Sequence, residues 1–307
     1  MVDTGLPKRT LGRTGLEVTT LGYGAMSLDD RFGRAVTEDE ARTILNAVLD
    51  SGINLIDTSP DYGPSEAYIG AAIAHRRDEY VLASKVGCPV DVDAGQQGHV
   101  YTRRNVIAGV EQSLRRMRTD HLDIVQFHGS PSRAALDEDG VLDALEALRR
   151  DGKVRFIGMS GTLPNLTDHL AMGVFEEYQI PYSIVQREHE VAISEAARLG
   201  AGTVIRGGVA RGGPSEEKAW DVRRLPEVPV ERPRQTWESA RLDELLGGMS
   251  RMEFTLRFTL SHPDVHTTIV GTANLDHLRA NCEVARRGPL PADVVAEAKR
   301  RLDAPAG

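Results

Sequence analysis

The sequence has little of what several protein classes require. Its 307 residues include only two cysteines, Cys88 and Cys282, which lie far apart and form no CxxC pair. This argues against a disulfide framework or a zinc site, and we expect both to be small buried residues. No apolar run approaches the roughly 18 residues of a membrane-spanning helix, and the opening MVDTGLPKRT lacks the apolar core of a secretion signal. We therefore expect a cytoplasmic protein that does not bind membranes.

Positive charge is also scarce. The chain has 37 Lys and Arg residues against 45 Asp and Glu, a formal net charge of −8. No broad basic field is available to hold a phosphate backbone, so we expect no nucleic-acid partner. With 40% hydrophobic and 27% charged residues, the chain suits a globular protein with a substantial core. Its length fits two ordinary domains or one large α/β barrel.

The glycine motifs of two common nucleotide-binding folds are missing as well. The nearest match to the dinucleotide fingerprint, GYGAMS at 22–27, has serine in the place of the third glycine and does not open a helix. A GxxxxGK[ST] phosphate loop does not occur. Both absences argue against an open, doubly wound sheet.

Apolar strand-like segments alternate with helix-like segments along most of the chain. A hairpin is predicted at 9–19, where Gly12 and Gly15 bracket the turn. Eight strands are predicted at 20–26, 53–57, 79–86, 121–128, 153–160, 182–186, 202–207 and 265–271. Eight helices are predicted at 37–52, 65–76, 102–117, 141–152, 163–172, 188–200, 250–261 and 274–286. The first helix has a capping box in Thr37 and Glu40.

Strands rich in Val, Ile and Leu that alternate with helices imply a parallel sheet covered on both faces. Eight such units favour the α/β class and a (β/α)8 TIM barrel, formed as one domain by residues 1–307. In these barrels the chemistry gathers where the strands end. Polar residues at or near the predicted strand ends, or in the loops just after them, are Asp57, Tyr62, Lys85, His128, Ser160 and Gln186.

The first four of these side chains suit proton transfer. A protonated lysine beside a carboxylate is expected to lower the pKa of a nearby phenol from about 10, so that Tyr62 acts as a general acid. His128 can polarise a carbonyl oxygen. The set has no nucleophile paired with a base and no three metal ligands, so it suits protonation of an alkoxide formed by hydride transfer.

No metal site is expected elsewhere. His262 and His266 are four residues apart, but Pro263 disrupts the helix that would align them. His189 and Glu190 begin an apparent HExxH motif that has no second histidine.

Seven motifs in order carry a family resemblance: LGRTGLEVTTLGYGAM, GINLIDTSPDYG, VLASKVG, HLDIVQFHG, GKVRFIGMS, SIVQ and TTIVGTANLDHLRANCE. Through them the sequence resembles the aldo-keto reductase superfamily over essentially the whole chain. The resemblance implies an NADPH-dependent carbonyl reductase on a barrel whose N-terminal end is plugged by a hairpin. The family's catalytic tetrad matches Asp57, Tyr62, Lys85 and His128, and all four are intact.

The resemblance also implies the cofactor positions. They match Gly24, Ala25, Met26, Asp57, Ser160, Gln186, Arg206, Gly207, Val209, Gly212, Gly271, Thr272, Asn274, His277 and Asn281. Gly161 stands where the family has an asparagine, and Gly271 and His277 stand where several relatives have lysine and arginine. Fewer positive charges weaken the case that the protein binds the 2′-phosphate of NADPH. Thr272, the first turn of the helix predicted at 274–286, and Arg279 are the remaining groups expected to hold it. NADPH is expected, with NADH as the alternative.

Residues 213–241 form a long segment without clear periodicity that follows the seventh strand. We expect it to cover the cofactor and shape substrate choice, with Trp220 or Trp237 as wall residues. The alternative is a loop ordered only by subunit or crystal contacts. For the whole chain, the complete tetrad favours an enzyme with a small-molecule carbonyl substrate over a cofactor-binding sensor or accessory subunit. The sequence leaves open which substrate it reduces and whether it forms a homo-oligomer.

Overall fold

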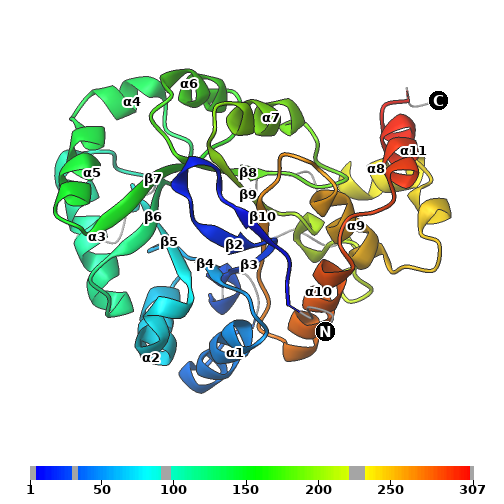
Figure 1. The fold of residues 1–307 in the computed structure, drawn as a ribbon, viewed down its shortest axis with the longest axis horizontal. Helices are drawn as coiled ribbons and strands as arrows, with labels where there is room; N and C mark the ends of the chain where they lie inside the picture. The colour runs from blue at the N-terminus through cyan, green and yellow to red at the C-terminus, as the bar shows by residue number, and fades with distance from the viewer. Residues whose placement is uncertain (1–4, 30–33, 91–97, 221–231, 305–307) are drawn as a thin grey trace.

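The computed structural model describes residues 5–29, 34–90, 98–220 and 232–304. Within them, eight parallel strands close into a barrel in the order β10-β3-β4-β5-β6-β7-β8-β9 (Figure 1). The strands are β3 (Leu21–Gly24), β4 (Leu55–Asp57), β5 (Val81–Val86), β6 (Leu122–Phe127), β7 (Val154–Ser160), β8 (Glu177–Pro181), β9 (Gly202–Arg206) and β10 (Thr267–Val270). The predicted (β/α)8 TIM barrel is confirmed.

Helices surround the barrel and cover the outer face of its strands (Figure 1). The eight predicted helices are α1 (Glu38–Asp50), α2 (Ser65–Ile73), α3 (Arg103–Met117), α5 (Val141–Arg150), α6 (Asn165–Met172), α7 (Glu190–Arg198), α9 (Arg251–Leu260) and α10 (Leu275–Arg287). Three further helices were not predicted: α4 (Arg133–Asp137), α8 (Arg232–Ser239) and α11 (Ala292–Leu302). The capping box is present, because the Thr37 side chain accepts from the amide of Glu40 and the Glu40 carboxylate accepts from that of Thr37.

One strand was placed wrongly. The sixth barrel strand was predicted at 182–186, but it is β8, Glu177–Pro181. Pro181 has no N–H and argues against a strand, yet it occupies the last position of β8, opposite Arg206. Residues 182–186 form a tight loop closed by an isolated bridge between Ser183 and Gln186, in which Tyr182 and Ile184 are buried without being in a strand.

Side-chain alternation divides each barrel strand into an outer and an inner row. On β4, Ile56 joins the large cluster shared with the helices, whereas Leu55 belongs to a smaller cluster inside the barrel. Asp57 is two residues beyond Leu55 and therefore points inward, nearer the carboxyl end. The same alternation places Ala83 low and Lys85 high on the inner row of β5. The interior is thus apolar near the amino ends of the strands and polar near their carboxyl ends.

A hairpin closes the amino end of the barrel. Its strands are β1 (Lys8–Thr10) and β2 (Glu17–Thr19), joined through the 3-10 turn η1 (Gly12–Thr14), and it lies in front of the barrel in Figure 1. Leu11, Leu16 and Val18 complete the small inner cluster with barrel residues. The Arg13 guanidinium donates hydrogen bonds to three backbone carbonyls at the edge of the barrel, those of Gly173, Phe175 and Leu199. The predicted hairpin is confirmed, and the site must open at the other end.

The long segment after β9 is described only in part, since 221–231 lie outside the described residues. Trp237 lies on α8 and is fully buried, with its ring 5.6 Å from that of Trp220 and 6.0 Å from that of Phe254. Both rings are packed in a local core, and their role as pocket walls stays a prediction. Among the described residues, no helix combines the length and apolar character needed to cross a bilayer.

Candidate active site

A buried ion pair lies at the upper end of the barrel interior. Lys85 Nζ donates to both carboxylate oxygens of Asp57 at 2.8 Å and to the carbonyl of Thr58 at 2.9 Å. These contacts occupy all three ammonium protons, and both side chains are almost completely buried. Burial alone would lower the pKa of Lys85, but the nearby acidic groups, Asp57 foremost, together with the hydrogen bond to Asp57, outweigh it and raise that pKa. The lysine is therefore a fixed positive charge.

Gln179 fixes the carboxylate from the other side. Its Nε2 donates to Asp57 Oδ2 at 2.8 Å, and its Oε1 accepts from Ser160 Oγ at 3.4 Å. Ser160 ends β7 as predicted, but Gln179 was missed because the sixth strand was misplaced. Glu177 and Gln179 are two residues apart in an otherwise apolar segment. This spacing was the signal that could have revealed that the segment is a strand with an inward-facing row of side chains.

Tyr62 and His128 lie beside this ion pair. Lys85 Nζ is 5.5 Å from the centre of the Tyr62 ring, and the Tyr62 and His128 rings are 6.1 Å apart and nearly perpendicular. The four side chains predicted as a tetrad are thus brought together. One expectation is wrong: burial raises the pKa of Tyr62 above its ordinary value, and the opposing effect of Lys85 does not reverse this. The phenol keeps its proton at neutral pH, which is the form a general acid needs.

His128 follows β6 and is held by three contacts. Its Nδ1 lies 3.3 Å from Asp61 Oδ2, 3.4 Å from Ser59 Oγ and 3.5 Å from Cys88 Sγ. Burial lowers the pKa of His128 to about 4, against the opposing effect of Asp61. The imidazole is therefore neutral at pH 7. Asp61, in the predicted loop but not among the predicted site residues, positions one ring nitrogen of this histidine.

A second carboxyl group is buried deeper in the barrel. Glu177 Oε1 accepts from Gln126 Nε2 at 3.2 Å, and a side chain at Gly158 would collide with Glu177 Oε2. Burial and the nearby Asp57 raise the pKa of Glu177 well above its ordinary value. Its raised pKa favours the neutral form beneath the ion pair, which leaves Asp57 as the partner of Lys85.

Two glycines meet where the barrel closes. Gly24 ends β3 and Gly271 follows β10, and a Cβ on Gly271 would lie 2.5 Å from the Gly24 carbonyl oxygen. This close approach explains why no lysine stands at Gly271. Ala25 and Met26 form the next turn, η2 (Ala25–Leu28). The predicted nicotinamide-side residues therefore lie at the rim of the barrel.

The glycine-rich loop after β9 has an unusual backbone. Gly207 and Gly212 have φ of +72° and +75°, a region that favours glycine. Arg206 ends β9, and Val209 precedes the short 3-10 turn η5 (Ala210–Gly212). A Cβ on Gly207 would meet nothing within 4 Å, so the backbone there is open to a ligand. The loop thus lies at the predicted rim with accessible backbone.

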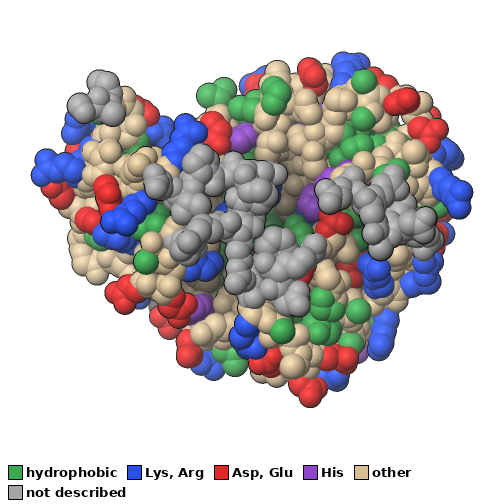
Figure 2. All heavy atoms as spheres, turned by 180° about the vertical axis from the view of Figure 1, so that it is seen from behind, with side chains coloured by type: hydrophobic (Ala, Val, Ile, Leu, Met, Phe, Trp, Pro, Cys, Tyr) green, Lys and Arg blue, Asp and Glu red, His purple; other side chains and the backbone are tan. Residues whose placement is uncertain are grey.

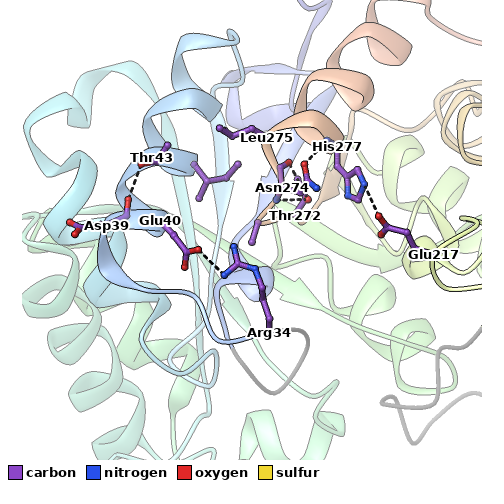
Figure 3. A pocket seen from close by; sticks show the side chains of 11 residues that line it. Arg34, Asp39, Glu40, Thr43, Glu217, Thr272, Asn274, Leu275 and His277 are labelled. Atoms are coloured by element: carbon purple, nitrogen blue, oxygen red, sulfur yellow. Dashed lines mark hydrogen bonds and ion pairs between the residues drawn. The ribbon is translucent and has the colours of Figure 1, made fainter.

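A cavity of about 590 Å³ lies at the outer edge of this rim (Figure 3). Its lining includes the predicted residues Thr272, Asn274 and His277. It also includes Arg34, whose Nη1 is 2.8 Å from Glu40 Oε1. Arg34 was not among the predicted site residues, although a basic residue in the loop after the first barrel strand was a usable signal. The face opposite the hairpin is hollowed near its centre, with histidine side chains beside the hollow (Figure 2).

Several side chains that were expected to contact the cofactor phosphate already have partners within the protein. The Asn274 side chain caps α10 by accepting from the amides of Asp276 and His277, and Arg279 pairs with Asp276 at 2.8 Å. His277 lies 3.6 Å from Glu217. Arg34 is thus the arginine in the lining of this cavity, while Asn281 lies farther along the same helix.

Gln186 does not end a strand. It lies in the loop after β8, where its amide donates to Glu188 at 2.9 Å. A side chain at Gly161, where an asparagine was expected, would press against Met159, Leu166 and His169 at 3.2 Å. Tight packing by α6 therefore accounts for the missing asparagine.

Comparisons with known proteins agree with this geometry. A model described as the Aldo/keto reductase family matches residues 20–302. The uncharacterized oxidoreductase YqkF of Bacillus subtilis is 27% identical over 287 residues, covering 91% of this chain and 90% of that protein. D-threo-aldose 1-dehydrogenase from Pseudomonas sp. is 26% identical, covering 94% and 95%. The solved holo form of aldo-keto reductase AKR11C1 from Bacillus halodurans has a TM-score of 0.83 at 30% identity, covering 98% and 97%.

Proposed function

The chain belongs to the aldo/keto reductase family, and from that premise we propose that it reduces an aldehyde or ketone to an alcohol with NADPH, using Tyr62 as the general acid. The observation that carries this proposal is the buried pair of Lys85 and Asp57 beside the Tyr62 ring. A protonated phenol next to a fixed ammonium is well placed to give up a proton, because the ammonium stabilises the phenolate that is left.

Each member of the tetrad has one task in this proposal. Tyr62 donates its phenolic proton to the oxygen of the substrate as negative charge develops there. Lys85 stays protonated and stabilises the phenolate, while Asp57 and Gln179 hold the ammonium in place. His128 is neutral and orients the carbonyl oxygen by hydrogen bonding, since Asp61 fixes its Nδ1.

The residues at the rim fit a nicotinamide dinucleotide. The open backbone at Gly207 suits a pyrophosphate, and the cavity beside Arg34 and Thr272 suits an adenosine end. Ser160 and the loop at Gln186 are the proposed carboxamide contacts. When bound, the reduced nicotinamide supplies the hydride. NADPH is favoured because Arg34 lines this cavity and would exchange its ion pair with Glu40 for one with the 2′-phosphate, with NADH as the alternative.

The identity of the carbonyl compound is a separate question. One relative is named as a dehydrogenase of D-threo-aldoses at position 1, a reaction that takes a hydride from the sugar. We therefore propose a panel of simple aldehydes and ketones tested with NADPH, and of aldoses tested in the oxidative direction with NADP⁺. We further propose that the protein works in the cytoplasm as one barrel domain, without nucleic-acid or membrane partners, which its net charge of −8 supports.

The test is a comparison of purified wild-type protein with Tyr62→Phe. Wild type is expected to oxidise NADPH in the presence of at least one carbonyl compound, followed at the nicotinamide absorbance. Tyr62→Phe should lower kcat by about 10² to 10⁴ fold while NADPH binding is kept. The matched control is Tyr68→Phe on α2, which removes a hydroxyl that donates to the Val36 carbonyl and should leave kcat unchanged.

Two results would contradict the proposal. Full activity in Tyr62→Phe would remove the assigned acid. NADPH binding without turnover of any compound in the panel would instead favour the sensor or accessory role.

A further inference from the structure

Four metal-ligating side chains converge beside His128. They are Asp61, Cys88, His99 and His128, and one ligand atom from each lies within 4.8 Å of all the others. They come from separate segments: the loop after β4, the residues after β5, the stretch before α3 and the residue after β6. Sequence spacing gave no sign of this group, because only the closed barrel brings the four segments together.

Three of the six separations between ligand atoms match the edges of a tetrahedron, and all six are within 4.8 Å. The Asp61 oxygen is 3.3 Å from His128 Nδ1 and 3.5 Å from His99 Nε2, and Cys88 Sγ is 3.5 Å from His128 Nδ1. Bond lengths of about 2.0 Å for Zn–N and about 2.3 Å for Zn–S place ligand atoms about 3.3 to 3.6 Å apart in tetrahedral geometry. A cation can therefore enter with only small side-chain movements.

The charges of the set also suit a divalent cation. A cysteine ligates a metal as its thiolate, so the Cys88 proton would pass to solvent on binding. One carboxylate, one thiolate and two neutral imidazoles then balance a charge of +2, and a neutral set is less costly to bury than a charged one.

The chemistry of the ligands selects the metal. Thiolate and imidazole favour Zn²⁺ over Mg²⁺ or Ca²⁺, which prefer oxygen ligands. Ser59 supplies an outer contact, since its hydroxyl lies 3.5 Å from Cys88 Sγ and 3.4 Å from His128 Nδ1. The ring of His99 packs edge-on against that of His128 at 4.8 Å, which keeps both nitrogens close.

We propose that Asp61, Cys88, His99 and His128 bind one Zn²⁺ ion beside the candidate active site. The site shares His128 with the proposed tetrad, but metal binding can be measured on its own, because the four ligands need neither a cofactor nor a carbonyl compound. It places a metal ion against His128, so occupancy would also fix which nitrogen of that ring is free.

Cobalt titration of the purified full-length protein tests the proposal directly. Tetrahedral Co²⁺ bound through a thiolate gives intense visible bands and a near-ultraviolet charge-transfer band. Wild type should show both at one equivalent, and one equivalent of Zn²⁺ should abolish them, whereas excess Mg²⁺ should not. The same Zn²⁺ should raise the melting temperature, because it binds the folded chain.

Variants locate the site. Cys88→Ser should remove the charge-transfer band. His99→Ala should weaken Co²⁺ binding by at least about 10-fold, because the loss of an outer-shell partner alone already has an effect of that size and a ligand matters more. Matched controls are Cys282→Ser, at the other buried cysteine, and His75→Ala, at an exposed histidine. Both should bind like wild type.

The proposal is overturned if no band forms, if the band survives in Cys88→Ser, or if it disappears in Cys282→Ser. Failure of the carbonyl assay would leave these spectra unaffected, so the two proposals can fail separately.

Discussion

At the scale of single residues, the position of the Asp57 carboxylate depends on donors from two strands. Lys85 on β5 donates to both oxygens, and Gln179 on β8 donates to one of them across the barrel. Hydrogen bonds to a charged group contribute more than neutral ones, so the loss of either should be measurable. Gln179 does not contact the substrate in our proposal and acts through Asp57 as a positioning residue.

Gln179→Leu should therefore lower kcat without changing cofactor affinity. Removing one charge-assisted bond of about 1.5 to 3 kcal/mol corresponds to a decrease of roughly 10- to 100-fold if the bond is fully used in the transition state. Steady-state kinetics and NADPH binding measured on the same sample check this. Gln112→Leu, on α3, is the control that should behave like wild type. An equal loss of NADPH affinity in Gln179→Leu would show that the barrel rim, not the ion pair, had changed.

His128 should make stability depend on pH. Its pKa is about 4 in the folded chain against an ordinary value of 6.5, so the unfolded chain binds more protons between these values. Stability is therefore lost as pH falls from about 6.5 to about 4. Denaturation at pH 7.5 and pH 5 should show that wild type loses about 1 to 2 kcal/mol more than His128→Gln. Equal losses in both proteins would mean that His128 is not protonated differently on unfolding.

At the scale of elements, the hairpin β1–β2 packs its apolar side chains into one end of the barrel and closes it. Leu11 is fully buried among inward residues of the strands, and Gly12 approaches so closely that a Cβ there would lie 2.3 Å from the amide of Gly202. The polar residues of the site are at the opposite end. Stability and chemistry are therefore separated along the barrel axis, as is usual for this architecture.

Leu11→Ala should lower the free energy of unfolding by about 3 kcal/mol, because it leaves a cavity that a closed barrel cannot fill. Urea denaturation measures the change, and kcat well below the melting temperature should stay as in wild type. Val191→Ala, at a position 83% exposed, should change stability by less than about 0.5 kcal/mol. A large decrease in kcat for Leu11→Ala would show that the plug and the site are coupled.

At the scale of the whole molecule, the first and last strands of the barrel meet at one seam. β10 pairs with β3 to close the barrel, and the Tyr23 hydroxyl donates to the Thr272 carbonyl across it at 2.8 Å. The cavity in Figure 3 lies over this seam, with Arg34 from the early chain and His277 from the late chain in its lining. A ligand there contacts residues more than 200 positions apart, so it should stabilise the closed barrel.

Arg34→Ala should distinguish the two nicotinamide cofactors. A surface guanidinium facing a 2′-phosphate contributes about 1 kcal/mol, so the Kd for NADPH should rise roughly fivefold while that for NADH stays nearly constant. Fluorescence titration with both nucleotides checks this. Arg42→Ala is the control, since Arg42 also pairs with a glutamate on α1 but does not line the cavity. Equal losses for both nucleotides would mean that Arg34 shapes the cavity without contacting a phosphate.

Much of this organisation was predictable from sequence because it depends on local rules. Alternation of apolar strands and amphipathic helices predicted the barrel, and the Thr37 capping box began α1 where expected. Asp57, Lys85 and His128 were found because strand ends in a parallel barrel converge. The strand β8 was misplaced because its terminal Pro181 opposes the local rule, and Gln179 was lost with it.

The sequence by itself determined the fold class, the plugging hairpin and the residue types at the rim, since these follow from the periods of helices and strands. Only the tertiary structure decided which of these side chains are charged and which are neutral. Burial, which no local pattern reveals, raises the pKa of Tyr62 and lowers that of His128. Closure of the barrel likewise brings Asp61, Cys88, His99 and His128 into one group, because distances across a barrel depend on all its strands at once.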